Sequence, residues 1–210
     1  MRWVHPFTCL LAGASGSGKS VFIARFLRHI DVMCDTHFDR IVLYYTEYQS
    51  DYRKLGSHII LREGLPTDGD DAGFVRPRLY ILDDLMIEGS GSTVISNLFT
   101  RGSHHRNLSV FFVTQNLFHQ GRSSRAISLN SSYIVLMKNP REKAQALYLA
   151  RQVCPENQKF FQQAYEDATR NPHSYLLLDL KQTTSENCRF RTNIFPDDES
   201  HVVYVPNSRK

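Results

Sequence analysis

The sequence predicts an α/β fold in which helices cover both faces of a mostly parallel central sheet. Segments of strand and helix character alternate along the chain, and in such chains the helices connect neighbouring parallel strands. A glycine-rich octapeptide, residues 13–20, lies between the first predicted strand and the first predicted helix. The chain has 210 residues, 41% of them hydrophobic and 22% charged, which suits one large domain of this class.

Local patterns define the individual elements. Apolar, β-branched and aromatic runs predict strands at residues 7–12, 40–46, 78–82, 108–113, 133–137 and 174–180, with an extended segment at 189–195. Apolar residues at helical spacing predict helices after residue 20 and near residues 93–101, 141–153 and 156–170. Glycine, proline and aspartate in residues 63–77 predict an exposed connection. We expect one domain over residues 1–195 and a loose C-terminal tail over residues 196–210.

The octapeptide Gly-Ala-Ser-Gly-Ser-Gly-Lys-Ser matches the phosphate-binding pattern Gly-x-x-x-x-Gly-Lys-Ser/Thr, or Walker A motif. Its glycines are expected to enter positive φ and so to curve the backbone N–H groups around a phosphate. Lys19 is expected to reach the β- and γ-phosphates, and the Ser20 hydroxyl to ligate Mg²⁺. The motif predicts a nucleoside triphosphate site formed by Gly13, Ala14, Ser15, Gly16, Ser17, Gly18, Lys19, Ser20 and Val21.

A second motif places carboxylates at the end of an apolar strand. Residues 79–84 read Leu-Tyr-Ile-Leu-Asp-Asp, which has the form of a Walker B motif. One carboxylate of such a motif holds the Mg²⁺ shell, and Asp83 is expected in that role together with Ser20. Asp84 is expected to orient and polarise the attacking water as a general base.

Polar and cationic residues complete the predicted site. Gln115 follows the strand at 108–113 and is expected beside the γ-phosphate, because an amide can both donate and accept hydrogen bonds. Charge that develops during phosphoryl transfer is commonly stabilised by an arginine, often from another molecule. Arg101 and Arg106 are candidates, as are Arg122 and Arg125, and the sequence does not select among them.

Missing motifs exclude some classes of P-loop protein. A GTPase requires Asn-Lys-x-Asp, for which the nearest text is Lys-Asn-Pro-Arg at residues 138–141, and the Leu-Ser-Gly-Gly-Gln signature of transporter ATPases is absent. A nucleotide or nucleoside kinase stays an alternative, since phosphate loops of this form occur in guanylate kinases. Adjacent Asp83 and Asp84 with a Gln-tipped strand favour hydrolysis by water. A non-enzymatic alternative is a nucleotide-gated assembly factor.

Charge and cysteine usage indicate the setting. The formal net charge is +4, which is compatible with a polyanionic partner without requiring one. The four cysteines have no Cys-x-x-Cys spacing, so we expect reduced thiols and an intracellular protein that is not secreted. No apolar stretch reaches the roughly 18 residues that a membrane span requires.

Several blocks together resemble a known family. Residues 13–20, 81–84 and above all 101–121 look like the viral genome-packaging ATPases of the FtsK/HerA superfamily, in particular the poxvirus-like ATPases of Maverick/Polinton elements and related DNA viruses of animals. The likeness continues through residues 128–133, 138–141 and 175–180, so it covers the chain from about residue 6 to residue 195.

The resemblance implies a P-loop NTPase of the RecA-like ASCE type, a three-layer sandwich that assembles into an oligomeric ring, commonly a hexamer. Such a ring pulls double-stranded DNA into a preformed capsid with ATP, contacting the DNA backbone and a capsid or portal component. It acts in the nucleus or a cytoplasmic virus factory of a host cell, or with the virion. The resemblance assigns phosphate and Mg²⁺ contacts to Gly16, Gly18, Lys19, Ser20 and Asp83. It assigns a water-activating role to Asp84 and a sensor role to Gln115.

Overall fold

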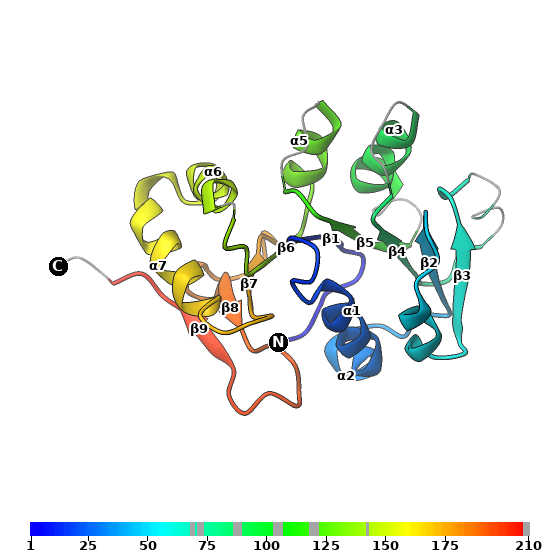
Figure 1. Cartoon of the computed structure of the whole chain (residues 1–210), viewed down its shortest axis with the longest axis horizontal. Helices are drawn as coiled ribbons and strands as arrows, with labels where there is room; N and C mark the ends of the chain where they lie inside the picture. Colours follow the sequence, from blue (N-terminus) through cyan, green and yellow to red (C-terminus); the bar gives the residue numbers. More distant parts are fainter. Residues whose placement is uncertain are drawn as a thin grey trace.

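The computed structural model describes residues 1–67, 70, 74–85, 90–102, 107–117, 122–141 and 143–207, with the backbone alone at residues 90–92, 101–102, 122–124 and 143. Within these residues, nine strands form one sheet in the order β3-β2-β4-β5-β1-β6-β7-β8-β9. Figure 1 shows β3 and β9 on opposite sides of the view, at the two edges of the sheet, with β1 near the centre. No helix among the described residues is long and apolar enough to cross a bilayer.

Six neighbouring strands run parallel, and the remaining three continue the sheet antiparallel. The parallel strands are β3 (Ile59–Glu63), β2 (Arg40–Tyr45), β4 (Arg78–Asp83), β5 (Leu108–Thr114), β1 (Thr8–Ala12) and β6 (Tyr133–Met137). The antiparallel strands are β7 (Tyr175–Asp179), β8 (Phe190–Thr192) and β9 (Val202–Tyr204). The central strands β1, β5 and β6 are buried along their whole length and mostly apolar, because both of their faces are covered. The prediction of a mostly parallel sheet is confirmed.

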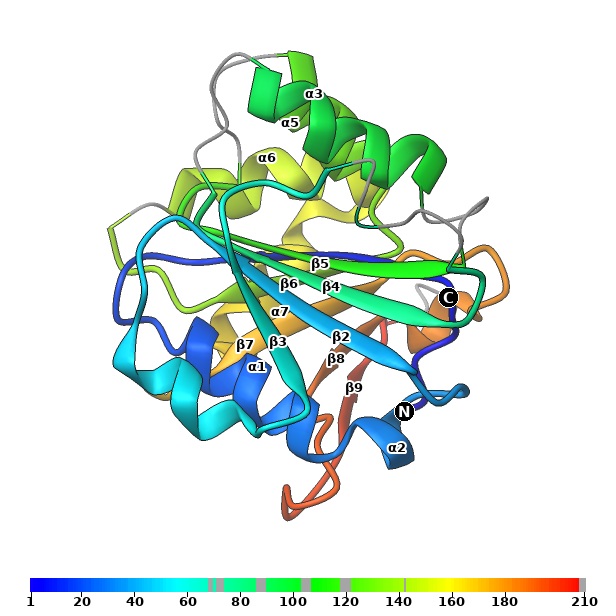
Figure 2. The same ribbon diagram turned by 90° about the vertical axis from the view of Figure 1, so that its right-hand side faces the viewer.

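Helices form a layer on each face of the sheet, as Figure 2 shows. One layer contains α1 (Lys19–Arg28), α2 (Ile30–Met33) and the 3₁₀ helix η1 (Ser50–Leu55). The other contains α3 (Ser90–Asn97), the π-helical turn η3 (Leu98–Gly102), α5 (Arg122–Leu129), α6 (Lys143–Val153) and α7 (Gln158–Ala168). Short 3₁₀ turns, η4 (Pro155–Asn157) and η5 (Glu186–Cys188), precede α7 and β8.

The alternation of side chains along β1 divides the core into two clusters. Leu10 and Ala12 pack in the cluster with α3, α6 and α7, whereas Cys9 and Leu11 pack in the cluster with α1 and α2. The predicted α/β sandwich of three layers is therefore confirmed, and β1 delivers the glycine-rich loop at the centre of its sheet.

An aromatic cluster fixes the position of α1 on the sheet. Trp3 is completely buried, and the centroid of its ring lies 5.2 Å from those of Phe7 and Phe26, 5.4 Å from that of Phe111 and 4.3 Å from that of Tyr133. These rings come from the N-terminus, α1, β5 and β6, and aromatic pairs at such distances stabilise one another beyond simple burial. These contacts fix α1, which begins at Lys19 directly after the glycine-rich loop, against the sheet.

Two short strands differ from the prediction. β3 has only three consecutive apolar residues and lies at an edge, so it has no strand-like pattern of its own. The sequence predicts a loose tail after residue 195, whereas Val202–Tyr204 form β9 on the edge of β8, with Phe190 opposite Tyr204. Arg25 of α1 also binds Asp197 and Asp198, at 2.6 and 2.9 Å, which ties this segment to the helix layer.

Candidate nucleotide-binding site

The glycine-rich loop connects the carboxyl end of β1 to the first turn of α1. The Gly13 N–H donates to the Thr114 carbonyl at 3.1 Å, which anchors the start of the loop to the end of β5. The Ser17 N–H donates to the Ala14 carbonyl at 3.1 Å and closes a turn within the loop. The loop is therefore pinned at the middle of the sheet, between the ends of β5 and β6.

The glycines of the loop serve two different purposes. Gly16 and Gly18 have φ of +73° and +103°, so the left-handed backbone that the motif predicts is present at both. Gly13 is not among the glycines with positive φ, and the expectation is wrong there. A Cβ on Gly13 would lie 2.5 Å from the Cβ of Met137 on β6, so glycine is required because the loop passes directly against that strand.

Lys19 lies folded over the loop. Its Nζ donates to the carbonyl oxygens of Gly13 at 2.6 Å and Ala14 at 3.1 Å. Partial burial lowers the pKa of Lys19, and the nearby carboxylates of Asp84 and Asp83 act in the opposite direction. An ammonium held by two neutral carbonyls exchanges them readily for phosphate oxygens, which are stronger partners for a charged donor.

No capping side chain and no acidic residue of its first turn neutralises the amino end of α1. Gly18 precedes the helix. The buried Ser17 hydroxyl has no hydrogen-bond partner among the described residues. Backbone N–H groups and the helix dipole at such an end attract anions, so the geometry fits phosphate.

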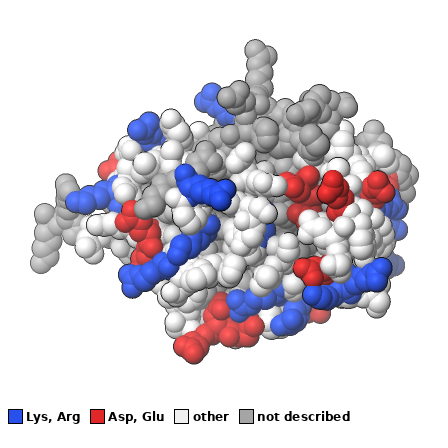
Figure 3. Space-filling model, in the orientation of Figure 1, with Lys and Arg blue, Asp and Glu red and all other residues white. Residues whose placement is uncertain are grey.

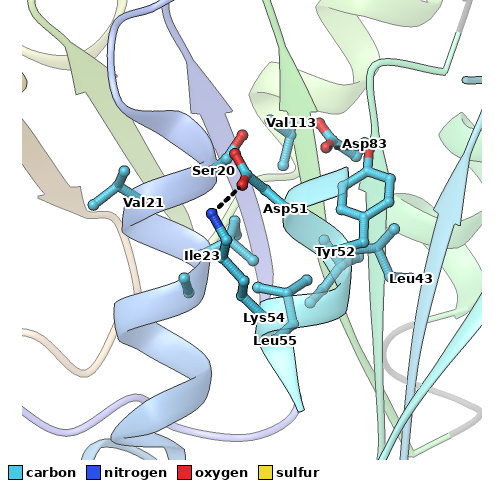
Figure 4. Close-up of a pocket in the computed structure, with 12 residues that line it drawn as sticks. Ser20, Val21, Ile23, Leu43, Asp51, Tyr52, Lys54, Leu55, Asp83 and Val113 are labelled. Carbon is cyan, nitrogen blue, oxygen red and sulfur yellow. Dashed lines mark hydrogen bonds and ion pairs between the residues drawn. The ribbon is translucent and has the colours of Figure 1, made fainter. Parts of the chain in front are cut away.

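Asp83 and Ser20 share a cavity of about 180 Å³ between α1 and η1 (Figure 4). The Tyr52 hydroxyl, on η1, donates to the Asp83 carboxylate at 2.8 Å. Burial raises the pKa of Asp83, and the hydrogen bond from Tyr52 opposes this rise. Burial also raises the pKa of Tyr52, so the phenol stays a donor. Sequence reasoning missed Tyr52, because nothing in its local pattern indicates a partner 31 residues away.

Asp84 and Gln115 meet at the ends of neighbouring strands. The Gln115 side-chain amide donates to the Asp84 carboxylate at 3.0 Å, and both residues are exposed. Asp84 has φ of +49°, a left-handed conformation that aspartate tolerates better than most residues. Its N–H donates to the Val113 carbonyl at 3.2 Å, which fixes this turn to β5.

The arginines are placed only in part. Arg101 belongs to η3, but its side chain lies outside the described residues, and Arg106 lies outside them entirely. Arg125 is exposed on α5. Arg189, which directly precedes β8, donates to the carbonyls of Asp179 and Lys181 and pairs with Glu186. Its guanidinium therefore has a structural role.

The oxygen ligands at the site suit Mg²⁺ bound together with a nucleotide. The described residues contain no group of three or more histidine, cysteine, aspartate or glutamate side chains that could hold a metal ion by themselves. Magnesium in nucleotide sites takes one or two protein oxygens and completes its shell with phosphates and water. The hydroxyl of Ser20 and the carboxylate of Asp83, which line one cavity, fit that requirement.

Comparisons with known proteins agree with this architecture. No protein-family model matches the chain, and no curated protein matches it in sequence. The structure of the genome packaging NTPase B204 from Sulfolobus turreted icosahedral virus 2 in complex with ATP-gammaS is similar, with a TM-score of 0.54 and 13% identity over 89% of this chain and 96% of that one. The complex of B204 with sulfate gives a TM-score of 0.54 and 13% identity over 85% and 94% of the two chains. The chain therefore has the fold of a P-loop NTPase.

Proposed function

We propose that this chain is an ATPase that drives the movement of double-stranded DNA, in the packaging of a viral genome into its capsid. The observation that carries the proposal is the meeting of Lys19, Asp83, Asp84 and Gln115 at the carboxyl ends of β1, β4 and β5. The similarity to B204, which is described as a genome packaging NTPase, supports the same proposal.

The geometry suggests how the residues divide the work of hydrolysis. The N–H groups of the glycine-rich loop that have no partner within the protein, together with the Lys19 ammonium, bind the phosphates of ATP. Asp84 accepts a proton from a water molecule. As it does so, the oxygen of that water bonds to the γ-phosphorus, and the bond from this phosphorus to the leaving ADP oxygen breaks. Gln115, already bonded to Asp84, positions that water or the γ-phosphate through its amide. The products are ADP, inorganic phosphate and a proton.

Ser20 and Asp83 would hold Mg²⁺, which when bound neutralises charge on the β- and γ-phosphates. Tyr52 keeps one oxygen of Asp83 engaged at 2.8 Å, which restricts the rotation of that carboxylate. We therefore assign Tyr52 as a positioning residue for the metal ligand.

The distribution of charge favours DNA contact by several copies of the chain. On the face shown in Figure 3, Lys and Arg are interspersed with Asp and Glu. Non-specific DNA binding depends on cations that track the phosphates. We propose that about six copies of the chain, the number that the family resemblance implies, form a ring. The ring would place basic loops of successive subunits around the DNA. Arg101 or Arg106 would act on the ATP of a neighbouring subunit, and a capsid or portal component would hold the ring at the assembling particle in the infected cell.

Phosphate release tests this proposal. The wild-type chain is expected to hydrolyse ATP, to do so faster with linear double-stranded DNA, and to form a ring under the same conditions. Lys19→Ala, which removes the charge that binds the β- and γ-phosphates, serves as the inactive control. A wild-type monomer whose turnover is indifferent to DNA contradicts the proposal. Phosphate transfer to a small acceptor would favour a kinase instead.

A further inference from the structure

A hollow of about 720 Å³ opens beside the glycine-rich loop, on the side of β6. Residues 14–17 form one wall, and residues 138–141, which follow β6, form the facing wall together with Pro172 and His173. The volume falls in the range of small-molecule sites, about 300–1,000 Å³. The cavity under Asp83 is much smaller, about 180 Å³.

The direction of a bound triphosphate follows from the order of the strands. Asp83, Asp84 and Gln115 lie at the ends of β4 and β5, so the γ-phosphate belongs on that side of the loop. β1 separates β5 from β6, and the rest of the nucleotide must leave on the side of β6. Gln115 also lines the hollow, so the hollow begins at the γ-phosphate end and continues to residues 138–141.

The facing wall is already held in place by hydrogen bonds. Lys138 Nζ donates to the Arg170 carbonyl at 2.8 Å, and its backbone N–H donates to the Ser174 carbonyl at 3.0 Å. The N–H of Asn139 donates to the Tyr165 hydroxyl at 3.3 Å. The segment after β6 and the turn before β7 therefore form one connected surface.

His173 contributes an aromatic ring to this surface. It is exposed, has φ of +59°, and lines the hollow. A Cβ on Gly18 would lie 3.0 Å from the Cβ of His173, so the histidine stands directly against the phosphate loop. An imidazole in this position offers a face on which a nucleobase can stack.

We propose that this hollow is the nucleoside subsite and that the base stacks on His173. The inference rests on the proposed function, because it extends the same nucleotide site beyond the phosphates. No aspartate or glutamate lines the hollow among the described residues, so no carboxylate is present there to accept the N1–H and N2–H₂ groups of guanine. The subsite binds a base through its face and discriminates weakly between ATP and GTP.

The test separates the nucleoside from the phosphates by measuring binding of ATP, GTP and inorganic tripolyphosphate. His173→Asn removes the ring while keeping a residue that tolerates positive φ. We expect this variant to lose about tenfold in affinity for ATP, the loss that one stacked base implies, and to bind tripolyphosphate as the wild type does. His173→Phe, which restores an aromatic face, is expected to bind ATP at least as tightly as the wild type. His58→Asn, at an exposed histidine before β3, is the matched control.

The possible failures are distinguishable. If the wild type binds neither ATP nor tripolyphosphate, the proposed nucleotide site itself is wrong. If it binds both equally tightly, or if His173→Asn leaves ATP affinity unchanged or weakens both ligands equally, the phosphate site stands and the stacking subsite is overturned. A strong preference for GTP over ATP overturns the assignment of weak base discrimination.

Discussion

The side-chain amide of Gln115 donates a hydrogen bond of 3.0 Å to the carboxylate of Asp84, joining the ends of β5 and β4. The register of the two strands explains this contact, because Asp83 lies opposite Val113 and both chains continue past that pair. An amide that holds a carboxylate oxygen fixes the orientation of the carboxylate without neutralising its charge. In the proposed mechanism, the pair would present a fixed acceptor to water, with the amide beside the γ-phosphate.

Asp84→Asn tests the assignment of the general base. Asparagine preserves the shape of the side chain but cannot accept the proton of the attacking water. We expect unchanged ATP affinity and a kcat reduced by about 10²–10⁴-fold, the usual contribution of a general base. Asp31→Asn, at an exposed residue of α2, is the matched control. Normal turnover by Asp84→Asn would show that another group activates the water.

Gln115→Leu tests the partner of that carboxylate. Leucine has nearly the volume of glutamine but can neither donate to Asp84 nor contact the phosphate. We expect a kcat at least about tenfold lower, because a positioned amide typically contributes about 1.5–3 kcal/mol in hydrogen bonds to charged groups. Steady-state kinetics and ATP binding should be compared with those of Gln162→Leu, an exposed glutamine on α7. A parallel loss in both variants would contradict a specific role.

Tyr52→Phe tests the positioning of Asp83. The ring stays in its place between Tyr45 and Tyr48, but the 2.8 Å hydrogen bond to the carboxylate is lost. We expect the Mg²⁺ concentration for half-maximal ATP binding to rise several-fold. The lost hydrogen bond should also lower the free energy of unfolding by about 1 kcal/mol. Titration of Mg²⁺ at fixed ATP, followed by binding rather than turnover, measures the effect. Tyr48→Phe is the control, and equal Mg²⁺ dependence in all three proteins would refute the assignment.

Gly13→Ala and Gly16→Ala separate the two roles of glycine in the loop. The new Cβ at residue 13 meets Met137 at 2.5 Å, so the loop or β6 must move, whereas nothing lies within 4 Å of a Cβ at residue 16. Gly16→Ala should therefore cost only the left-handed backbone, about 1–2 kcal/mol. Gly13→Ala should lower the free energy of unfolding by more than that. Chemical denaturation of the two variants decides, and the reverse order would contradict the packing argument.

We expect His5 to make the stability of the fold depend on pH. Its ring bonds Ser109 at 2.7 Å and Asn107 at 2.6 Å, and burial lowers its pKa, with Asn107 and Asp35 opposing and Lys181 adding to this shift. The unfolded chain, with a histidine pKa of about 6.5, therefore binds the proton more readily than the folded chain. The contribution to stability is present above about pH 6.5 and is lost as the pH falls through the lower folded pKa.

We expect the free energy of unfolding of the wild type to decrease from about pH 7 to about pH 5 more steeply than that of His5→Gln. Glutamine can keep a hydrogen bond but does not titrate. Urea denaturation at several pH values provides both slopes. Equal slopes would show that His5 does not contribute to the pH dependence.

The sequence predicts five of the six parallel strands and the phosphate loop because each has a strong local pattern. β1, β5 and β6 are buried apolar runs, and the octapeptide of residues 13–20 has fixed spacing. β3 and β9 are short edge strands whose formation depends on their neighbours in the sheet. The contact of Tyr52 with Asp83 and the approach of residues 138–141 to the loop also come from the order of the strands, which local patterns do not reveal.

We propose that ATP hydrolysis by this chain moves it along double-stranded DNA. Displacement of a third, triplex-forming strand from linear double-stranded DNA measures such movement directly. We predict displacement by the wild type with ATP and Mg²⁺, and none with a non-hydrolysable analogue or with Asp84→Asn. Hydrolysis of ATP at full rate without any displacement would contradict the account of this protein as a DNA-translocating ATPase.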